Sequence, residues 1–139
     1  MSCPFCEQEG TRLWSDDRLR VVSAADPRYP GFCRVVWFTH VKEMSDLTPA
    51  DRHHFMAVVF GVEGVLRTLL RPDKINLASL GNQVPHLHWH VIPRWVDDSH
   101  FPEPVWCLPQ RVARTRPALK QQLARLPAAF AEALPRQLN

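Results

Sequence analysis

The chain of 139 residues has a net charge of +3, and 45% of its residues are hydrophobic while 22% are charged. This composition is typical of a soluble globular protein, and the length is sufficient for one hydrophobic core without support from disulfides or metal ions. No apolar run approaches the length needed to cross a bilayer, which argues against a membrane protein. We therefore expect a single domain over residues 1–139.

The start of the chain and its cysteines bear on the cellular compartment. The first residues lack the basic, apolar and small-residue order of a secretory signal. Cysteines in such a protein are expected to stay reduced, as thiols or metal ligands. The four residues concerned are Cys3, Cys6, Cys33 and Cys107. The sequence thus predicts a cytoplasmic protein.

Three strands are predicted near the N-terminus. Residues 12–14 and 19–22 are apolar segments separated by the turn Asp16–Asp17, which favours a hairpin. A loop rich in proline and glycine follows at residues 26–31. The apolar residues 32–38 then predict a third strand.

A long helix is predicted between Thr48 and Arg71. Thr48 is a candidate N-cap, Pro49 suits the first helical position, and Asp51 is an acid in the first turn. Pro72 ends the helical pattern. Apolar residues recur at steps of three and four along this segment and predict one buried face, composed of Phe55, Val58, Val59, Val62, Val65, Leu66 and Leu69. We expect this helix to cover the sheet.

Two further strands are predicted at residues 74–80 and 86–93, joined by the short connection 81–85, which gives an α+β order. Residues 97–116 are rich in proline and predict an ordered extended arm that packs on a partner subunit. Residues 117–134 have a helical composition interrupted by proline, which indicates two short helices or one bent helix.

The C-terminal segment is basic. From Arg111 onward there are six basic residues against one acid, so this segment carries +5 and the rest of the chain −2. Such a block is capable of contacting nucleic acid or a substrate phosphate. We interpret it as a solvated helical face, and we do not expect a nucleic-acid partner.

Three histidines alternate with apolar residues in the segment 86–92. Side chains of a strand point to opposite faces in turn, so His86, His88 and His90 are predicted to share one face at spacings of roughly 6–7 Å. Two chemistries suit them: the three bind a metal ion that activates water, or one attacks a phosphorus atom while its neighbours handle charge and protons. A straight strand spans too far for one ion to take all three, which favours the second.

The turn before the histidines suits a phosphate group. Gly81 allows the backbone to approach a phosphate closely, and the amides of Asn82 and Gln83 are hydrogen-bond donors. Phosphoryl transfer places negative charge on phosphoryl oxygens in the transition state, and such donors stabilise it. We therefore predict that these three residues bind substrate.

The segment 86–92, His-Leu-His-Trp-His-Val-Ile, resembles the signature of the histidine triad, or HIT, family. The resemblance extends upstream through the strand that ends near His40, the long helix and the glycine turn, and it covers residues 3–95. It implies an α+β fold with a five-stranded antiparallel sheet and one long covering helix, paired with a second copy in a homodimer. Residues 96–139 are then a C-terminal arm and helix of the same domain.

The resemblance also implies an activity. HIT proteins are nucleotide hydrolases and transferases, and the middle histidine of the triad is their nucleophile, here His88. It would attack the α-phosphate of a nucleotide phosphoramidate or dinucleoside polyphosphate, and water would hydrolyse the nucleotidyl-histidine intermediate. His86 and His90 would bind and orient the phosphoryl group. The alternatives are a nucleotidyltransferase or phosphorylase with the same nucleophile, and a nucleotide-binding module with little turnover.

The sequence departs from the common family pattern around the substrate. Because the loop before the triad is short, Ser79 or Asn76 is expected to make contacts that a longer polar loop makes elsewhere. Gln83 stands where many members carry serine or threonine. Residues 23–25 lack the acid with which many relatives hold the ribose, although Asp26 lies close. The nucleobase and the leaving group are therefore open.

Cys3 and Cys6 have the two-residue spacing that lets both thiolates reach one tetrahedral ion. Some bacterial HIT proteins pair such cysteines with a histidine that matches His40 and with the first triad histidine, His86. The resemblance therefore implies a structural zinc ion held by these four residues. The alternative is two reduced thiols without metal.

Three other residues, two histidines and a tryptophan, are expected to have structural roles rather than to bind a metal ion or a nucleobase. His54 is expected at the surface of the long helix, and His100 in a solvated loop. Trp106 is expected to anchor a core or an interface rather than to stack on a base.

Overall fold

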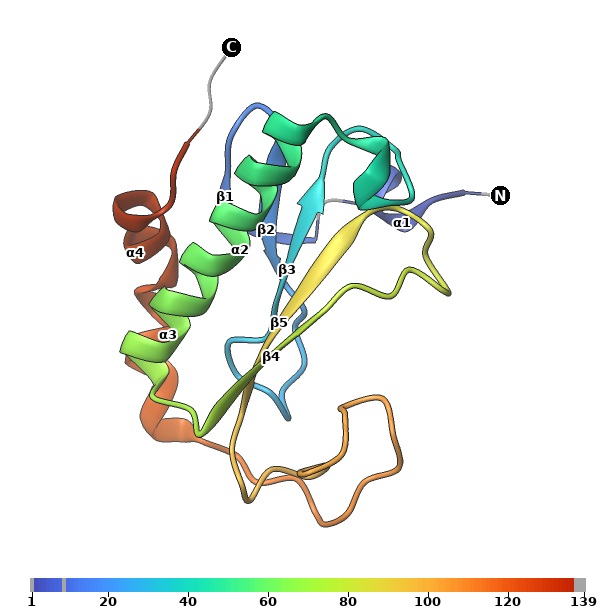
Figure 1. Cartoon of the computed structure of the whole chain (residues 1–139). Helices are drawn as coiled ribbons and strands as arrows, with labels where there is room; N and C mark the ends of the chain where they lie inside the picture. The colour runs from blue at the N-terminus through green and yellow to red at the C-terminus, as the bar shows by residue number, and fades with distance from the viewer. Residues whose placement is uncertain (1, 9, 137–139) are drawn as a thin grey trace.

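The computed structural model describes residues 2–8 and 10–136, and it contains a five-stranded antiparallel sheet with its long helix on one face (Figure 1). The strand order is β1-β2-β3-β5-β4. The strands are β1 (Thr11–Ser15), β2 (Leu19–Ser23), β3 (Cys33–Trp37), β4 (Lys74–Ala78) and β5 (His88–Arg94). The predicted α+β fold with five antiparallel strands and one long covering helix is confirmed.

Four α-helices accompany the sheet in the described part of the chain: α1 (Pro4–Glu7), α2 (Pro49–Leu70), α3 (Lys120–Ala124) and α4 (Leu126–Ala133). Two short 3-10 turns lie at Met44–Asp46 and Pro117–Leu119. The helices α3 and α4 are the two short helices predicted for the C-terminal segment, and they lie beside α2 (Figure 1).

Helix α2 forms where its cap residues predicted. The hydroxyl of Thr48 accepts a hydrogen bond from the backbone N–H of Asp51 at 3.1 Å, and Arg71 ends the helix in a left-handed conformation with φ of 50°. Among the described residues, helix α2 has the length and apolar composition of a membrane-crossing helix. This differs from the expectation that no apolar segment would be long enough to cross a bilayer. The apolar face of α2 packs on the sheet, which accounts for this composition.

The sheet has one face toward α2 and one face away from it. The core on the α2 side includes Leu19, Val21, Val35, Phe55, Leu87 and Val91, and the half-buried Trp89 packs against it. Residues that lie opposite each other in antiparallel strands point to the same face. His90 lies opposite Arg34, and His88 lies opposite Val36, all on the face away from α2. This second face carries the candidate site.

Strand β5 begins at His88, two residues later than the predicted strand. Before it, the N–H of Leu87 donates to the carbonyl oxygen of Val41 at 2.8 Å, and its own carbonyl accepts from the N–H of Trp37 at 3.3 Å. The first bond ties the chain to the segment after β3 and the second ties it to the last residue of β3. The predicted strand 86–93 therefore starts two residues too early, and His86 lies just outside β5.

The hairpin of β1 and β2 is closed by a buried carboxylate. Asp16 accepts hydrogen bonds from the backbone N–H groups of Arg18 and Leu19, and His54 of α2 lies 2.8 Å from its second oxygen. His54 is 5% exposed, so its expected surface position was wrong. The position of His54 in the helical pattern did not indicate that its ring would bond to the buried carboxylate of Asp16.

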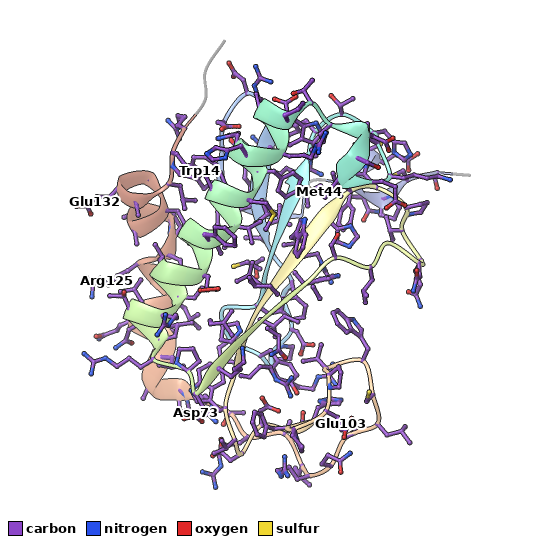
Figure 2. The ribbon with its side chains drawn as sticks, viewed as in Figure 1. Trp14, Met44, Asp73, Glu103, Arg125 and Glu132 are labelled. Carbon is purple, nitrogen blue, oxygen red and sulfur yellow. The ribbon has the colours of Figure 1, made fainter. Side chains whose placement is uncertain are left out.

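Residues 95–116 contain no helix or strand and form the arm predicted from their prolines. Figure 2 shows the arm beyond the end of β5, with Glu103 labelled on it. Arg94, only 2% exposed, donates to Asp98 at 2.8 Å and to the carbonyl oxygen of Glu103 at 2.7 Å. These bonds hold the arm to β5 and thereby fix the position of Trp106.

His100 is buried in the arm, and its expected place in a solvated loop was wrong. Its Nδ1 lies 2.7 Å from the hydroxyl of Tyr29 and 2.9 Å from that of Ser99. The Tyr29 hydroxyl also donates to Asp98 at 3.2 Å. The loop before β3 therefore packs on the arm, a contact between segments that local sequence did not indicate.

The first arginines of the basic segment lie on the arm rather than on a helix, contrary to the predicted solvated helical face. Arg111 donates to the carbonyl oxygen of Asp98 at 2.5 Å, and Arg114 and Arg116 pair with Asp97. Their charges therefore serve the folding of the arm.

Asp98→Asn is expected to lower the free energy of unfolding at pH 7 by about 2 kcal/mol or more. Burial opposes ionisation of Asp98, but hydrogen bonds from Arg94 and from the N–H groups of Trp95, Phe101 and His100 outweigh it and lower the pKa to about 2. Because this value lies below the ordinary 3.8, the stabilisation is present above pH 4 and is lost as the pH falls toward 2.

Urea unfolding of the wild type and the variant between pH 7 and pH 2 measures this effect. The difference between the two proteins should shrink below pH 4, while Glu132→Gln, at an exposed position on α4, should change little at any pH. A difference that persists undiminished at pH 2 would contradict the role of the Asp98 charge.

Candidate functional site

A cavity of about 550 Å³ opens on the sheet face away from α2. His88 and His90 of β5 lie in its wall. The other described lining residues come from the N-terminal segment (Pro4, Phe5, Gln8, Gly10), from β2 and β3 (Val22, Ser23, Arg34), from the loop after β4 (Leu80, Gly81, Asn82, Gln83, Val84) and from the arm (Trp106).

His88 has one ring nitrogen bonded and one free. Its Nδ1 lies 2.6 Å from the carbonyl oxygen of His86, and because a carbonyl only accepts, Nδ1 carries the proton. Burial lowers the pKa of His88 despite this hydrogen bond, and the charge of Arg34 lowers it further. The ring packs edge-on against Phe5, with centroids 4.7 Å apart. A neutral imidazole with a free Nε2 lone pair is the state required of a nucleophile.

His90 is held by aromatic rings rather than by hydrogen bonds. Its ring centroid lies 4.8 Å from that of His88, 4.9 Å from that of Trp106 and 5.7 Å from that of Phe32. Burial, and then the charge of His88 in its protonated form and that of Arg34, lower its pKa to about 3, so it is neutral near pH 7. Its Nδ1 is enclosed without a hydrogen-bond partner among the described residues, which leaves Nε2 to bond a ligand.

Arg34 is a site residue that the sequence analysis missed. It lines the cavity from β3, opposite His90, and packs over the ring of Phe32 at 5.5 Å. Burial lowers the pKa of its guanidinium, an effect opposed by the charge of Asp26. A signal was present in the sequence, because Arg34 is the one charged residue in the apolar run 32–38.

The loop after β4 brings part of the predicted substrate-binding set to the cavity. Gly81, Asn82 and Gln83 line it, and Gly81 has a φ of 72°, a conformation that favours glycine. Ser79 and Asn76 are not among the described lining residues: the hydroxyl of Ser79 donates to the carbonyl oxygen of His88 at 2.7 Å, and Asn76 Oδ1 accepts from Arg94 at 2.7 Å. Both side chains form hydrogen bonds with residues of β5 and thereby support the strand that carries His88 and His90.

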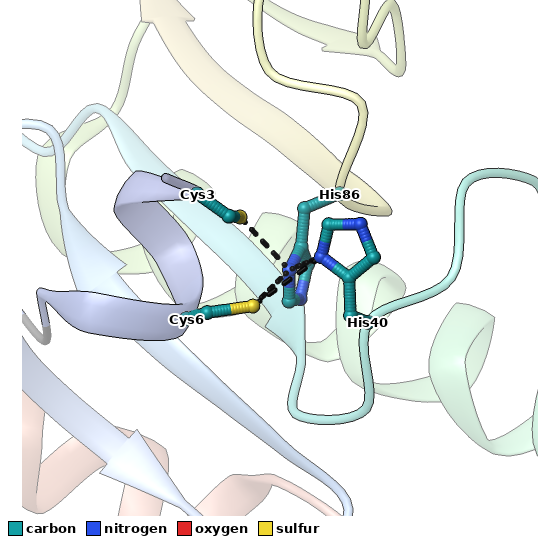
Figure 3. Close-up of side chains that lie close together, drawn as sticks. All are labelled: Cys3, Cys6, His40 and His86. Carbon is teal, nitrogen blue, oxygen red and sulfur yellow. Dashed lines mark hydrogen bonds between the residues drawn. The ribbon is translucent and has the colours of Figure 1, made fainter. Parts of the chain in front are cut away.

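His86 lies outside the cavity and joins a second constellation, which Figure 3 shows. Its Nε2 donates to the carbonyl oxygen of Trp37 at 2.6 Å, which leaves Nδ1 without a proton. This Nδ1 lies 3.4 Å from Cys3 Sγ, 3.5 Å from Cys6 Sγ and 3.1 Å from His40 Nδ1. Both ring nitrogens are therefore committed away from His88 and His90.

The four residues of this cluster are arranged to hold a metal ion. All their ligand atoms lie within 4.8 Å of one another, and Cys6 Sγ is 3.3 Å from His40 Nδ1. A tetrahedral zinc ion with bonds of roughly 2.3 Å to sulfur and 2.0–2.1 Å to nitrogen requires ligand atoms roughly 3.3–3.8 Å apart. The contacts of 3.1, 3.3, 3.4 and 3.5 Å within the sequence-predicted set of Cys3, Cys6, His40 and His86 lie close to this range, so the set suits such an ion. The three triad histidines do not form a metal-binding group among the described residues.

The HIT domain family model matches residues 6–96, a span that contains all five strands and α2. The chain belongs to the HIT domain family. Among solved structures, this HIT protein is similar to a histidine triad protein from Bradyrhizobium japonicum, with a TM-score of 0.74, 25% identity and 93% of each chain covered. It is also similar to a Zn-bound histidine triad family protein from Mycobacterium smegmatis, with a TM-score of 0.67, 24% identity and 95% of each chain covered.

Curated relatives of this HIT protein are enzymes by name. It is 32% identical over 110 residues to the AP-4-A phosphorylase of Mycobacterium tuberculosis, covering 73% of this chain and 56% of that protein. It is 32% identical over 75 residues to the bis(5'-adenosyl)-triphosphatase of Saccharomyces cerevisiae, covering 50% of this chain and 36% of that protein. The chain thus spans about half or less of the length of these relatives.

Proposed function

We propose that this HIT protein hydrolyses dinucleoside polyphosphates or nucleotide phosphoramidates through a nucleotidyl-histidine intermediate on His88. The observation that carries the proposal is the Nδ1–H bond from His88 to the carbonyl oxygen of His86, which directs a free Nε2 into the cavity. The names of the two curated relatives support a dinucleoside polyphosphate as substrate.

The geometry suits a two-step displacement. The Nε2 lone pair of His88 attacks the α-phosphorus, and the bond from phosphorus to the leaving group breaks with its electron pair on the departing atom. Water then attacks the same phosphorus, the nitrogen–phosphorus bond breaks, and its electron pair returns to Nε2 while the water proton passes to solvent. His90 Nε2 and the N–H groups of residues 81–83, which line the cavity, would stabilise the charge on the phosphoryl oxygens. Trp106 and Phe5 provide aromatic walls for a nucleoside.

A phosphorylase is the second candidate, because the relative from Mycobacterium tuberculosis is named as one. In that reaction inorganic phosphate replaces water in the second step, and the nucleoside diphosphate is the product. The first step and the nucleophile are the same.

Turnover of defined substrates tests the proposal. The purified protein is incubated with adenosine 5′-phosphoramidate and with diadenosine polyphosphates, each with and without inorganic phosphate, and the products are separated by chromatography. We expect release of AMP without phosphate. ADP from diadenosine polyphosphates that forms only when phosphate is present would identify the phosphorylase instead. Nucleotide binding without any product would contradict both and indicate a binding module.

We further propose that Cys3, Cys6, His40 and His86 hold a structural zinc ion. The mixed sulfur and nitrogen donor set is one that zinc prefers, and four protein ligands leave no position open for substrate. The ion would join α1 to the segments before and after the strands at the centre of the sheet. It would hold His86, whose carbonyl oxygen orients His88.

Two other expectations concern the state of the protein in the cell. All four cysteines are free of disulfides, which supports a reducing, cytoplasmic compartment. Apolar side chains are exposed on the arm and at the end of β4, which supports the proposal that a second copy of the chain covers them in a homodimer. These are Leu80, Val96, Leu108 and Val112.

A further inference from the structure

Arg34 places an unpaired positive charge in the wall of the cavity. Its guanidinium makes no hydrogen bond or ion pair with the described residues, although the residue is half-buried. Asp26, the carboxylate whose charge acts on it, is held by Arg28 through hydrogen bonds of 3.1 and 2.9 Å. Removing a guanidinium from water without a partner is costly, so such a group indicates an anion that is supplied from outside the chain.

The cavity has no other permanent charge of either sign among its described lining residues. Of its two histidines, His88 directs its Nδ1–H to a carbonyl oxygen, and His90 is neutral near pH 7 because burial lowers its pKa to about 3. Neutral imidazoles and backbone N–H groups suffice to contact one phosphoryl group. A fixed cation beside them suits a ligand that carries additional negative charge.

Arg34 and the glycine loop lie on different sides of the histidines. The strand order places β3 on one side of β5 and β4 on the other, and the loop that contains Gly81 follows β4. A phosphoryl group at His88 is therefore within a cavity that has N–H donors on one side and the guanidinium on the other.

We infer that Arg34 binds a second phosphoryl group beside the one that His88 attacks. This inference rests on the proposed function and narrows its substrate class to reactions with two adjacent phosphoryl groups. The second group is either the β-phosphoryl of a polyphosphate leaving group or inorganic phosphate that accepts the nucleotidyl group.

The chemistry of the leaving group favours the same class. When the bond from the α-phosphorus to the bridging oxygen breaks, the electron pair stays on that oxygen, and the polyphosphate departs as an anion that a cation stabilises. An amine leaving group needs a proton instead. The described lining residues contain no carboxylic acid, and its pKa of about 3 makes His90 a poor proton donor.

Arg34→Gln and Arg34→Lys, compared on two substrates, test the inference. With diadenosine tetraphosphate, we expect Arg34→Gln to lower kcat/KM by roughly 10–100-fold, since a charge-assisted contact is lost, and Arg34→Lys to recover part of this loss. With adenosine 5′-phosphoramidate, the loss should be several-fold smaller. Arg67→Gln, at an exposed position on α2, is the matched control and should leave both values unchanged.

The reaction conditions distinguish the two sources of the second phosphoryl group. If it belongs to the leaving group, Arg34→Gln slows labelling of His88 by diadenosine tetraphosphate in a single turnover without phosphate. If it is the acceptor, labelling is unchanged and the phosphate-dependent formation of ADP falls. Equal losses on both substrates without phosphate, or no loss in either reaction, would overturn the inference.

Calorimetry with inorganic tripolyphosphate separates this inference from the proposed function. Wild type should bind tripolyphosphate, and Arg34→Gln should weaken the affinity at least 10-fold with an unchanged melting temperature. If no substrate is turned over and this binding still depends on Arg34, the proposed function fails and the anion site stands. If turnover occurs and tripolyphosphate binds equally to both proteins, the site assigned to Arg34 is wrong.

Discussion

His88→Gly is expected to lower kcat/KM for the preferred nucleotide substrate by roughly 10⁴-fold or more, because among the described lining residues His88 alone has an Nδ1–H bond to a carbonyl that leaves the Nε2 lone pair for attack. The covalent nucleotidyl-enzyme that forms on the wild type should be absent. Rapid acid-free quenching followed by mass spectrometry of the intact protein detects this intermediate. Added imidazole should restore part of the turnover, since the small cavity left by the substitution can admit the missing ring.

His53→Ala is the matched control. His53 is an exposed histidine on α2, remote from the second face of the sheet, and its replacement should leave turnover and labelling unchanged. The melting temperature should change by only a few degrees in His88→Gly, since the lost ring makes one hydrogen bond and edge contacts with Phe5 and His90. A labelled intermediate that survives in His88→Gly would identify a different nucleophile.

Cys6→Ser is expected to abolish zinc binding and to destabilise the protein. Cys6 is exposed, so the substitution costs little packing and reports on the loss of a ligand. A zinc concentration 1,000-fold above the dissociation constant stabilises a folded protein by about 4 kcal/mol, which corresponds to a melting temperature roughly 10–20 °C higher for a domain of this size. Atomic emission should find about one zinc ion per chain in the wild type, as expected for one Cys₂His₂ site, and almost none in the variant.

Cys107→Ser is the control, because Cys107 is also exposed and lies outside the cluster. It should keep both its metal and its melting temperature. The loss of zinc in Cys6→Ser should also raise KM, because α1 carries Phe5, which packs against His88. Zinc retained at full stoichiometry in Cys6→Ser, or a wild type purified in zinc-containing buffer without metal, would refute the zinc site.

Local sequence was a good guide where one segment's own pattern settles its structure. Thr48 and Pro49 marked the start of α2, and its apolar spacing marked the face that packs on the sheet. The alternation in residues 88–91 fixed which side chains of β5 face the core, because the pleat of a strand has a period of two residues.

The limits of that guide are visible at the ends of elements and at buried charges. His86 follows the alternation in sequence, yet β5 begins only at His88, and the N–H of the intervening Leu87 bonds to Val41 in the segment after β3. His54 and His100 are both buried, and each is hydrogen-bonded to a group distant in sequence, since His54 donates to Asp16 and His100 bonds to the hydroxyl of Tyr29. A contact between segments far apart in sequence leaves no mark in the local pattern.

The sequence by itself therefore determined the fold class, the order of the elements and the histidines on which the chemistry depends, because these follow from periodicity, caps and a local motif. Only the tertiary structure decided which polar residues join the cluster of cysteines and histidines and which residues line the cavity. It committed His86 to the cluster with Cys3 and Cys6, and it placed Arg34 unpaired in the cavity opposite His90. The physical reason is that a ligand set or a charge environment is a property of distances between segments, and strand pairing sets those distances.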